Sequence, residues 1–161
     1  ARRGFARVIE VSAGDRTDLG AVSVLAVPAI HPGNRYPLGS KTEALGYVIE
    51  ADGRRVYFAG DTDLFDGMSE LGDLDLALLP VWGWGPRLGP GHLDPERAAE
   101  ALALLEPRLA VPVHWGTLSP RVNRDRTRRL IDPPHEFAAA AARIAPAVEI
   151  RILAPGDALD L

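Results

Sequence analysis

Residues 111–117, with the sequence VPVHWGT, join a short apolar run to a histidine and then to a small polar turn. Two earlier stretches end in the same way: residues 27–31 (VPAIH) end in a histidine, and residues 56–61 (VYFAGD) end in an aspartate. Imidazole and carboxylate groups are ligands that zinc, manganese and iron accept. Three β-like runs that stop at such a side chain therefore indicate a metal site.

The composition is that of an ordinary globular domain. The chain has 161 residues, 47% apolar and 25% charged, so one domain over residues 1–161 is expected. Its net charge of −4 argues against sequence-specific nucleic-acid binding, which usually needs a basic surface. No apolar run reaches the roughly 18 to 20 residues of a transmembrane helix, and a cytoplasmic location is expected. Because the chain has no cysteine, any metal must be held by His, Asp or Glu.

Turn residues and apolar periodicity divide the chain into strands first and then into alternating strands and helices, which favours a layered α/β or α+β architecture. The Asp52-Gly53 pair suits a two-residue type I′ turn between two strands. Asp94 and Pro95 open the most regular helix as N-cap and first-turn proline. The expected elements are, in chain order, strands at 5–11 and 21–29 separated by a turn-rich stretch at 12–18, strands at 44–51 and 54–59, a short helix at 64–71, a strand at 73–81, a helix at 95–105, a strand at 109–113, a helix at 134–144, and a last strand at 148–153 with a hairpin end at 156–159.

Two loops rich in Pro and Gly follow expected strands. Residues 32–40 are long enough to overhang a site, and Arg35 and Tyr36 in this loop are candidates for substrate contact. Residues 82–91 form an irregular loop that leads to His92.

The four candidate side chains lie in sequence contexts that together resemble a known family. His31, Asp61, His92 and His114 occur in PAIH, FAGDT, GHLDPE and VPVHWGT. At these separations the pieces resemble the C-terminal half of metallo-β-lactamase-fold hydrolases. The most similar branch contains ascorbate-6-phosphate lactonase and the N-acyl-phosphatidylethanolamine phospholipase D enzymes. The resemblance extends over residues 5–157, nearly the whole chain.

The resemblance implies a fold and a metal centre. The fold is an α+β, four-layer αββα sandwich, with two metal ions, usually zinc and in some cases manganese, where its two sheets meet. By this match His31 completes the first metal site, Asp61 bridges both metals and His114 completes the second site. His92 sits over the metals and polarises or protonates the substrate oxygen, so Asp61 and His92 are the expected catalytic residues.

The chemistry of such a centre is hydrolysis. Two metals lower the pKa of a bridging water from about 15.7 towards 7 and stabilise the oxyanion that forms. The expected reaction is attack by metal-bound hydroxide on a phosphodiester, lactone or other ester-like bond of a small molecule, and an anionic substrate would suit the arginines described below.

One part of the family pattern is missing from these residues. The family takes four further ligands from a His-x-His-x-Asp-His motif in its N-terminal half, and residues 1–161 contain no such motif. Each metal would keep about two protein ligands where a catalytic zinc normally has three. The chain alone is therefore expected to bind metal weakly, to be inactive, and to leave an apolar sheet face or edge uncovered.

Two explanations remain open at this point. The missing half comes from residues outside this sequence, from a proteolytic partner fragment or from a second copy of the chain. Alternatively, the chain is a non-catalytic or degenerate module of the fold that serves assembly or binding, which predicts no stoichiometric metal.

Several residues next to the candidate ligands have supporting roles in this interpretation. Thr62 and Thr117 directly follow or closely follow a ligand and are expected to hydrogen-bond the ligand loops. Asp63 has the features of a local turn or cap residue. The loops also contain three tryptophans, Trp82, Trp84 and Trp115. These side chains either line a substrate cleft or pack the loops.

A cluster of arginines stands out from the acidic background. It is either a solvated face or a clamp for phosphate or carboxylate, because the guanidinium fork matches these anions. His135 is expected to lie on the surface. The arginines are Arg121, Arg124, Arg126, Arg128 and Arg129.

Overall fold

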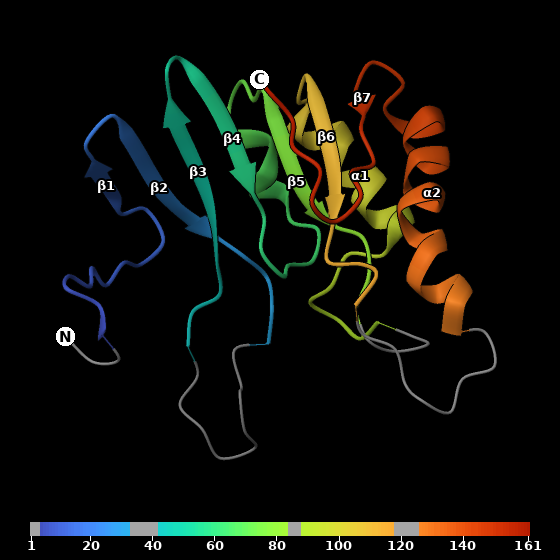
Figure 1. The fold of residues 1–161 in the computed structure, drawn as a ribbon, viewed down its shortest axis with the longest axis horizontal. Coiled ribbons are helices and arrows are strands. Elements are labelled where there is room, and N and C mark those ends of the chain that lie inside the picture. Colours follow the sequence, from blue (N-terminus) through green and yellow to red (C-terminus); the bar gives the residue numbers. More distant parts are fainter. Residues whose placement is uncertain (1–3, 33–41, 84–87, 118–125) are drawn as a thin grey trace.

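The structure, a computed structural model, describes residues 4–32, 42–83, 88–117 and 126–161. These residues form one mixed sheet of seven strands in the order β1-β2-β3-β4-β5-β6-β7, with helices against one face (Figure 1). The strands are β1 (Arg16–Leu19), β2 (Val22–Pro28), β3 (Leu45–Ala51), β4 (Arg54–Phe58), β5 (Leu76–Pro80), β6 (Leu109–Val113) and β7 (Glu149–Ile150). The helices are the 3-10 helix η2 (Asp66–Glu70), α1 (Pro95–Leu105) and α2 (Arg126–Ile144).

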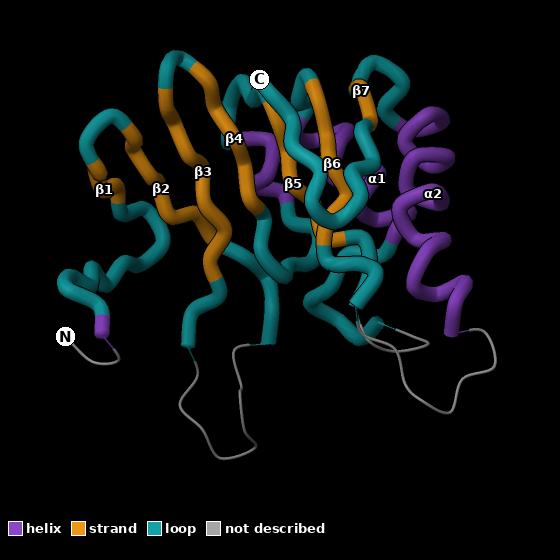
Figure 2. Tube along the Cα trace, in the orientation of Figure 1, coloured by secondary structure: helices purple, strands orange, loops and turns teal. Residues whose placement is uncertain are grey.

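The directions of the strands determine which strand ends and turns lie at each edge of the sheet. Strands β1 to β4 pair antiparallel, whereas β4 to β7 pair parallel. It follows that β2, β4, β5 and β6 all point the same way, and Figure 2 shows their ends along one edge of the sheet. We call this the carboxyl edge, and we call the opposite edge, which carries the β1–β2 and β3–β4 turns, the turn edge.

The central hairpin agrees with the sequence prediction. β3 and β4 are joined by Asp52 and Gly53, whose φ angles are 51° and 73°. Positive φ at both central residues is what a type I′ turn requires, and an Asp-Gly pair tolerates it better than most pairs. The predicted hairpin is confirmed.

The predicted strand at residues 5–11 is wrong. This segment has no regular structure, and its Phe5 and Val8 side chains are 64% and 62% exposed. The first strand is instead β1, which begins inside the stretch expected to be a turn. The turn itself is short and is closed by a hydrogen bond from the Asp15 N–H to the Ser12 carbonyl oxygen. Residues 5–11 have strand-like composition, but no strand of the described residues pairs with them.

Helix α1 has the predicted bounds, and its start has the predicted cause. The Asp94 carboxylate accepts a hydrogen bond from the Arg97 N–H, so it caps the helix directly before Pro95. The buried face of α1 includes Ala98 and Leu102.

Helix α2 begins at Arg126, well before the predicted start at Pro134. Proline is disfavoured inside a helix because it lacks the N–H donor, and for that reason the prediction began at the last of two prolines. The structure carries the helix through both, with Pro134 and Phe137 buried against the core shared with α1.

The other predicted elements are correct in place and differ in extent. The helix expected at 64–71 is only the short 3-10 helix η2, and the strand expected at 148–153 is only β7. No strand forms at 156–159. A turn is found there instead, in which the Asp157 N–H donates to the Ala154 carbonyl oxygen.

The two faces of the sheet are covered unequally. One face packs on α1 and α2 through buried side chains such as Tyr57, Ala77 and Leu79. On the other face, the segment after β7 crosses β5 and β6, and its Leu153 and Leu159 pack on a small cluster around Leu76, Leu109 and Val111 (Figure 1).

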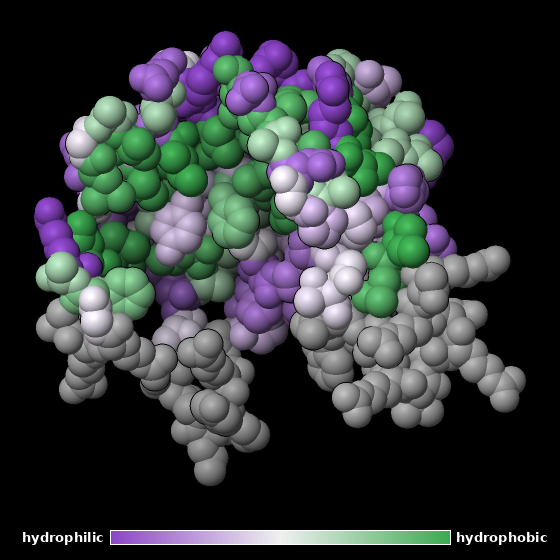
Figure 3. Space-filling view, in the orientation of Figure 1, coloured by the Kyte–Doolittle hydropathy of each residue, from purple (hydrophilic) through white to green (hydrophobic). Residues whose placement is uncertain are grey.

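The rest of that second face is apolar and open. Val24, Ile49 and Val56 lie opposite one another on β2, β3 and β4, and Tyr47 lies opposite Phe58 in the next row. All five side chains keep solvent exposure, which is 40% for Phe58. Figure 3 shows apolar side chains gathered over these strands.

The described residues thus form a sheet layer and a helix layer. A second sheet and a second helix layer, expected from the four-layer αββα sandwich, are not among them. The helices of the described part of the chain include none that is both long and apolar enough to cross a membrane.

Candidate metal centre

The carboxyl edge brings together residues that lie far apart in the sequence. His31 follows β2, Asp61 follows β4, and His114 directly follows β6. His92 lies in the connection from β5 to α1, shortly before the helix cap Asp94. Because β2, β4, β5 and β6 point the same way, the segments that leave them meet at one place.

Three of these residues form a group that could hold a metal ion. Ligand atoms of His31, Asp61 and His92 all lie within 4.8 Å of one another. The Nε2 atoms of His31 and His92 are 3.3 Å apart, and the two rings are nearly perpendicular. In the described part of the chain, Nδ1 of His92 is buried and has no hydrogen-bond partner.

His114 lies close to the same aspartate. Its backbone has a φ of 61°, a left-handed conformation that is uncommon outside glycine and is often retained at functional sites. Nε2 of His114 lies 3.5 Å from Oδ1 of Asp61. Asp61 is therefore close both to His114 and to the pair formed by His31 and His92.

The second ring nitrogen of His114 determines what the first one offers. Nδ1 lies 2.5 Å from the carbonyl oxygen of Trp82. A carbonyl oxygen only accepts hydrogen bonds, so Nδ1 carries the proton and Nε2 of the neutral ring presents a lone pair. In the neutral ring, this lone pair faces the Asp61 carboxylate. The nitrogen and the carboxylate are then two electron-pair donors close together, and they are satisfied by a cation between them or by protonation of the ring.

The residues present thus fit a metal ion of the borderline class. Three imidazoles and one carboxylate are a donor set that zinc, manganese and iron accept. The contact between His114 and the Trp82 carbonyl is also typical of metal-binding histidines, which commonly donate their other N–H to a carbonyl oxygen.

The neighbouring residues have more varied roles. Thr62 is fully buried; its Oγ1 accepts from the Ile30 N–H at 2.9 Å and donates to the Asp63 carbonyl oxygen. Trp115 donates from Nε1 to the Pro112 carbonyl oxygen and packs on the core, as one of its two expected roles requires. Thr117 is exposed, and its hydroxyl donates to the Trp115 carbonyl oxygen at 3.5 Å.

Several predicted residues cannot be placed. Arg35, Tyr36, Trp84, Arg121 and Arg124 lie outside the described residues. Arg126, Arg128 and Arg129 belong to α2, although their side chains are not described. His135 is exposed on α2, in agreement with its expected surface position.

Sequence reasoning missed the importance of Asp63. Its carboxylate accepts hydrogen bonds from the Leu64 and Gly91 N–H groups and from the Arg97 guanidinium. Burial alone would raise the pKa of this carboxyl, but the hydrogen bonds from Gly91, Arg97 and Leu64 outweigh it, so the pKa is lower than usual. The partners lie up to 34 positions away, so no local pattern predicts them.

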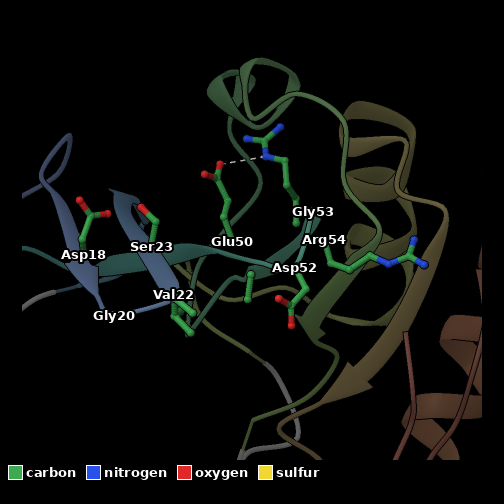
Figure 4. Close-up of a pocket in the computed structure, with 11 residues that line it drawn as sticks. Asp18, Gly20, Val22, Ser23, Glu50, Asp52, Gly53 and Arg54 are labelled. Carbon is green, nitrogen blue, oxygen red and sulfur yellow. Dashed lines mark hydrogen bonds and ion pairs between the residues drawn. The ribbon is translucent and has the colours of Figure 1, made fainter.

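The structure has hollows at both edges of the sheet. At the carboxyl edge, a pocket of about 340 Å³ is lined by Ala29, Ile30, His31, Pro32, Pro90 and Gly91. At the turn edge, an open hollow of about 440 Å³ surrounds Glu50 and Arg54 (Figure 4). The second is larger, but it contains no histidine.

Known proteins resemble this chain in sequence and in structure. Residues 1–115 match the family described as "Beta-lactamase superfamily domain". A "UPF0173 metal-dependent hydrolase" of Thermococcus onnurineus is 36% identical over 151 residues, which are 90% of this chain and 58% of the relative. A "UPF0173 metal-dependent hydrolase" of Opitutus terrae is 37% identical over 97% of this chain and 64% of the relative.

A solved structure shows the same fold. Igni18, described as a novel metallo hydrolase from the archaeon Ignicoccus hospitalis, has a TM-score of 0.70 and 29% identity, covering 92% of this chain and 58% of its own. The chain spans less than two thirds of the length of each of these relatives. The metallo-β-lactamase fold expected from the sequence motifs is confirmed, and by its family match the chain belongs to the beta-lactamase superfamily.

Proposed function

We propose that the protein is a metal-dependent hydrolase whose centre is held by His31, Asp61 and His114, with His92 beside it. The observation that carries this proposal is the convergence of His114 Nε2 on the Asp61 carboxylate at 3.5 Å, with Nδ1 held by the Trp82 carbonyl oxygen. The names of the relatives, metal-dependent hydrolase and metallo hydrolase, support it.

We further propose two metal ions, with zinc as the expected metal and manganese as the second choice. Asp61 is close both to the pair formed by His31 and His92 and to His114, so its carboxylate would be the ligand shared by two ions. A bound metal would supply Lewis-acid chemistry, lowering the pKa of water and polarising the substrate oxygen.

The chain's own groups have separate tasks in this proposal. Asp61, His31 and His114 hold the metal ions, and the Trp82 carbonyl orients the His114 ring. His92 has a buried Nδ1 without a partner among the described residues, so its ring can hold a proton for the substrate oxygen. The pocket of about 340 Å³ beside His31 offers room for part of a small substrate.

The proposed substrate is a small molecule with a phosphodiester, lactone or other ester-like bond. This class is what the resemblance of the sequence motifs to the lactonase and phospholipase D branch implies. If the arginines near the start of α2 contact the substrate, it is anionic.

The active form, in this proposal, contains more polypeptide than these residues. Asp61 and three histidines provide fewer ligands than two catalytic metals need. The open apolar face around Ile49, Val56 and Phe58 is of the kind that another layer covers. An upstream segment, a partner fragment or a second copy of the chain could supply both the ligands and the cover.

Metal content and chelator-dependent hydrolysis test the proposal together. The full-length protein is purified, its intact mass and its metal content are measured, and it is assayed on a chromogenic phosphodiester, a lactone and a carboxylic ester. Hydrolysis of at least one substrate that is lost with a chelator and restored by zinc or manganese is the expected result.

Two results would contradict it. Hydrolysis that is indifferent to the chelator would exclude the metal mechanism. A protein without stoichiometric metal and without activity would favour the alternative expected from the incomplete ligand set, a non-catalytic module of the same fold.

A further inference from the structure

We propose that Asp63 is a positioning residue that fixes the His92 loop against the segments carrying His31 and Asp61. This inference rests on the proposed function, because the side chains that Asp63 would position are those of the proposed metal centre. Asp63 itself is not proposed to touch metal or substrate.

The Asp63 side chain holds the His92 loop. Oδ2 accepts a hydrogen bond from the Gly91 N–H at 3.1 Å, and Gly91 directly precedes His92. Oδ1 accepts from the Arg97 Nε at 2.9 Å and from the Leu64 N–H at 2.8 Å. Since Arg97 belongs to α1, the carboxylate ties both the His92 loop and the helix that follows it to the end of β4.

The Asp63 backbone holds the His31 segment. Its N–H donates to the Ile30 carbonyl oxygen at 2.8 Å, and its own carbonyl oxygen accepts from the Thr62 hydroxyl, which in turn accepts from the Ile30 N–H. Ile30 directly precedes His31. One residue therefore binds the neighbours of both histidines, and it lies two positions after Asp61.

The two histidine loops are in contact where Asp63 joins them. Gly91 has a φ of +90°, and a Cβ built on it would lie 2.3 Å from Cδ of Pro32 and 3.2 Å from Cα of His31. Only glycine allows this close approach. The 3.3 Å separation of the histidine Nε2 atoms thus depends on how closely the Gly91 backbone is held.

A purely stabilising role for the Asp63–Arg97 ion pair would have a different signature. The Arg97 side chain is 42% exposed, and partly exposed ion pairs contribute little to the free energy of unfolding. A positioning role instead predicts that removing the carboxylate changes the histidine geometry and the metal affinity more than the melting temperature.

The test compares Asp63→Ala and Asp63→Asn with the control Glu96→Ala. Glu96 forms a similar carboxylate–arginine pair with Arg143 at 2.8 Å, but it contacts neither histidine loop. Asn cannot replace Asp63 fully, because one amide has a single acceptor oxygen for the Gly91 N–H and the Arg97 guanidinium.

The readouts include one that needs no metal. In the metal-free full-length protein, we expect Asp63→Ala to speed hydrogen exchange of the Gly91 amide and to remove the nuclear Overhauser contact between the His31 and His92 rings. In zinc titrations we expect roughly 10- to 100-fold weaker binding, the range typical for residues that orient metal ligands. Asp63→Asn should lie between Asp63→Ala and the unaltered protein, and Glu96→Ala should leave all three readouts unchanged.

Failure of this inference is distinguishable from failure of the proposed function. Unchanged Gly91 exchange and an unchanged ring contact in Asp63→Ala would overturn the positioning role, even if zinc binds. Equal effects of Asp63→Ala and Glu96→Ala would also overturn it. Absence of zinc binding in the unaltered protein would contradict the proposed function, while the metal-free comparison would still decide the role of Asp63.

Discussion

The two edges of the sheet use the same kinds of polar residue in opposite ways. At the turn edge, Glu50 lies 2.7 Å from the Arg16 guanidinium and 3.1 Å from that of Arg55, so its charge is compensated on both sides. At the carboxyl edge, Oδ1 of Asp61 faces Nε2 of His114 at 3.5 Å, and among the described residues it forms no ion pair with an arginine or lysine. Compensated charges need no further partner, whereas the Asp61 carboxylate and the His114 nitrogen are satisfied by a cation between them or by protonation of the ring. The difference separates a structural network from a candidate site.

A site chosen by the volume of its hollow alone would be placed at the turn edge, which is the wrong one. The hollow at the turn edge, about 440 Å³, is larger than the pocket of about 340 Å³ beside His31 (Figure 4). The hydrogen bond from Arg16, ahead of the other contacts, lowers the pKa of Glu50, and this marks a carboxylate that already has its partner. The chemistry of the donors locates the site where volume does not.

The comparison predicts its largest effect at Asp61. In the full-length protein, Asp61→Ala removes the carboxylate that is close to all three histidines. The bound metal should stabilise the transition state by several kcal/mol, so its loss should slow hydrolysis on the order of 10³-fold. Steady-state rates and metal content measure the change. The matched variant at the turn edge, Glu50→Ala, should keep both values.

The opposite pattern would break the comparison. Hydrolysis that survives Asp61→Ala would remove the assigned mechanism, and equal losses in Asp61→Ala and Glu50→Ala would show that both act through the stability of the sheet.

The sequence predicts the strands, the turn and the helix start that build the carboxyl edge, because the signals for these elements are local. An Asp-Gly turn, a capped helix start at Asp94 and apolar runs ending in His or Asp each occupy a few adjacent residues. Strand direction then follows from the hairpins and crossovers, and it brings the ends of β2, β4 and β6 together.

What the sequence could not predict depends on distant partners. Residues 5–11 have strand composition, but a strand needs a neighbour, and the described residues offer none. Helix α2 runs through two prolines because its packing against α1 outweighs the loss of two N–H donors. Asp63 has the local features of a turn residue, and only the fold places Gly91 and Arg97 against it.

A smaller effect is expected from acid. The pKa values of Glu50, Asp63 and Asp75 are all lower than usual; the hydrogen bond from the Arg55 N–H is the main cause at Asp75. In the unfolded chain these groups bind protons near their ordinary pKa of about 4, so below that pH the unfolded state binds more protons than the folded state. The free energy of unfolding should therefore fall as the pH is lowered from about 5 to 3.

Urea midpoints at several pH values measure this dependence. Asp75→Asn removes one of these three carboxyls, does not alter the candidate site, and should make the acid dependence shallower. An identical dependence in the variant and the unaltered protein would show that Asp75 is not stabilised by its charge.

The smallest effect is expected between the two edges, at Tyr57 on β4. Its hydroxyl is buried and has no hydrogen-bond partner in the described part of the chain, and burial raises the pKa of the phenol. Tyr57→Phe removes a buried polar atom and keeps the ring, so the unfolding free energy should stay within about 1 kcal/mol or rise. A loss above that size in urea unfolding would reveal a hydrogen bond to the hydroxyl. Metal content should not change, because in the described part of the chain no donor is bonded to the Tyr57 hydroxyl, whereas histidine nitrogens converge on Asp61.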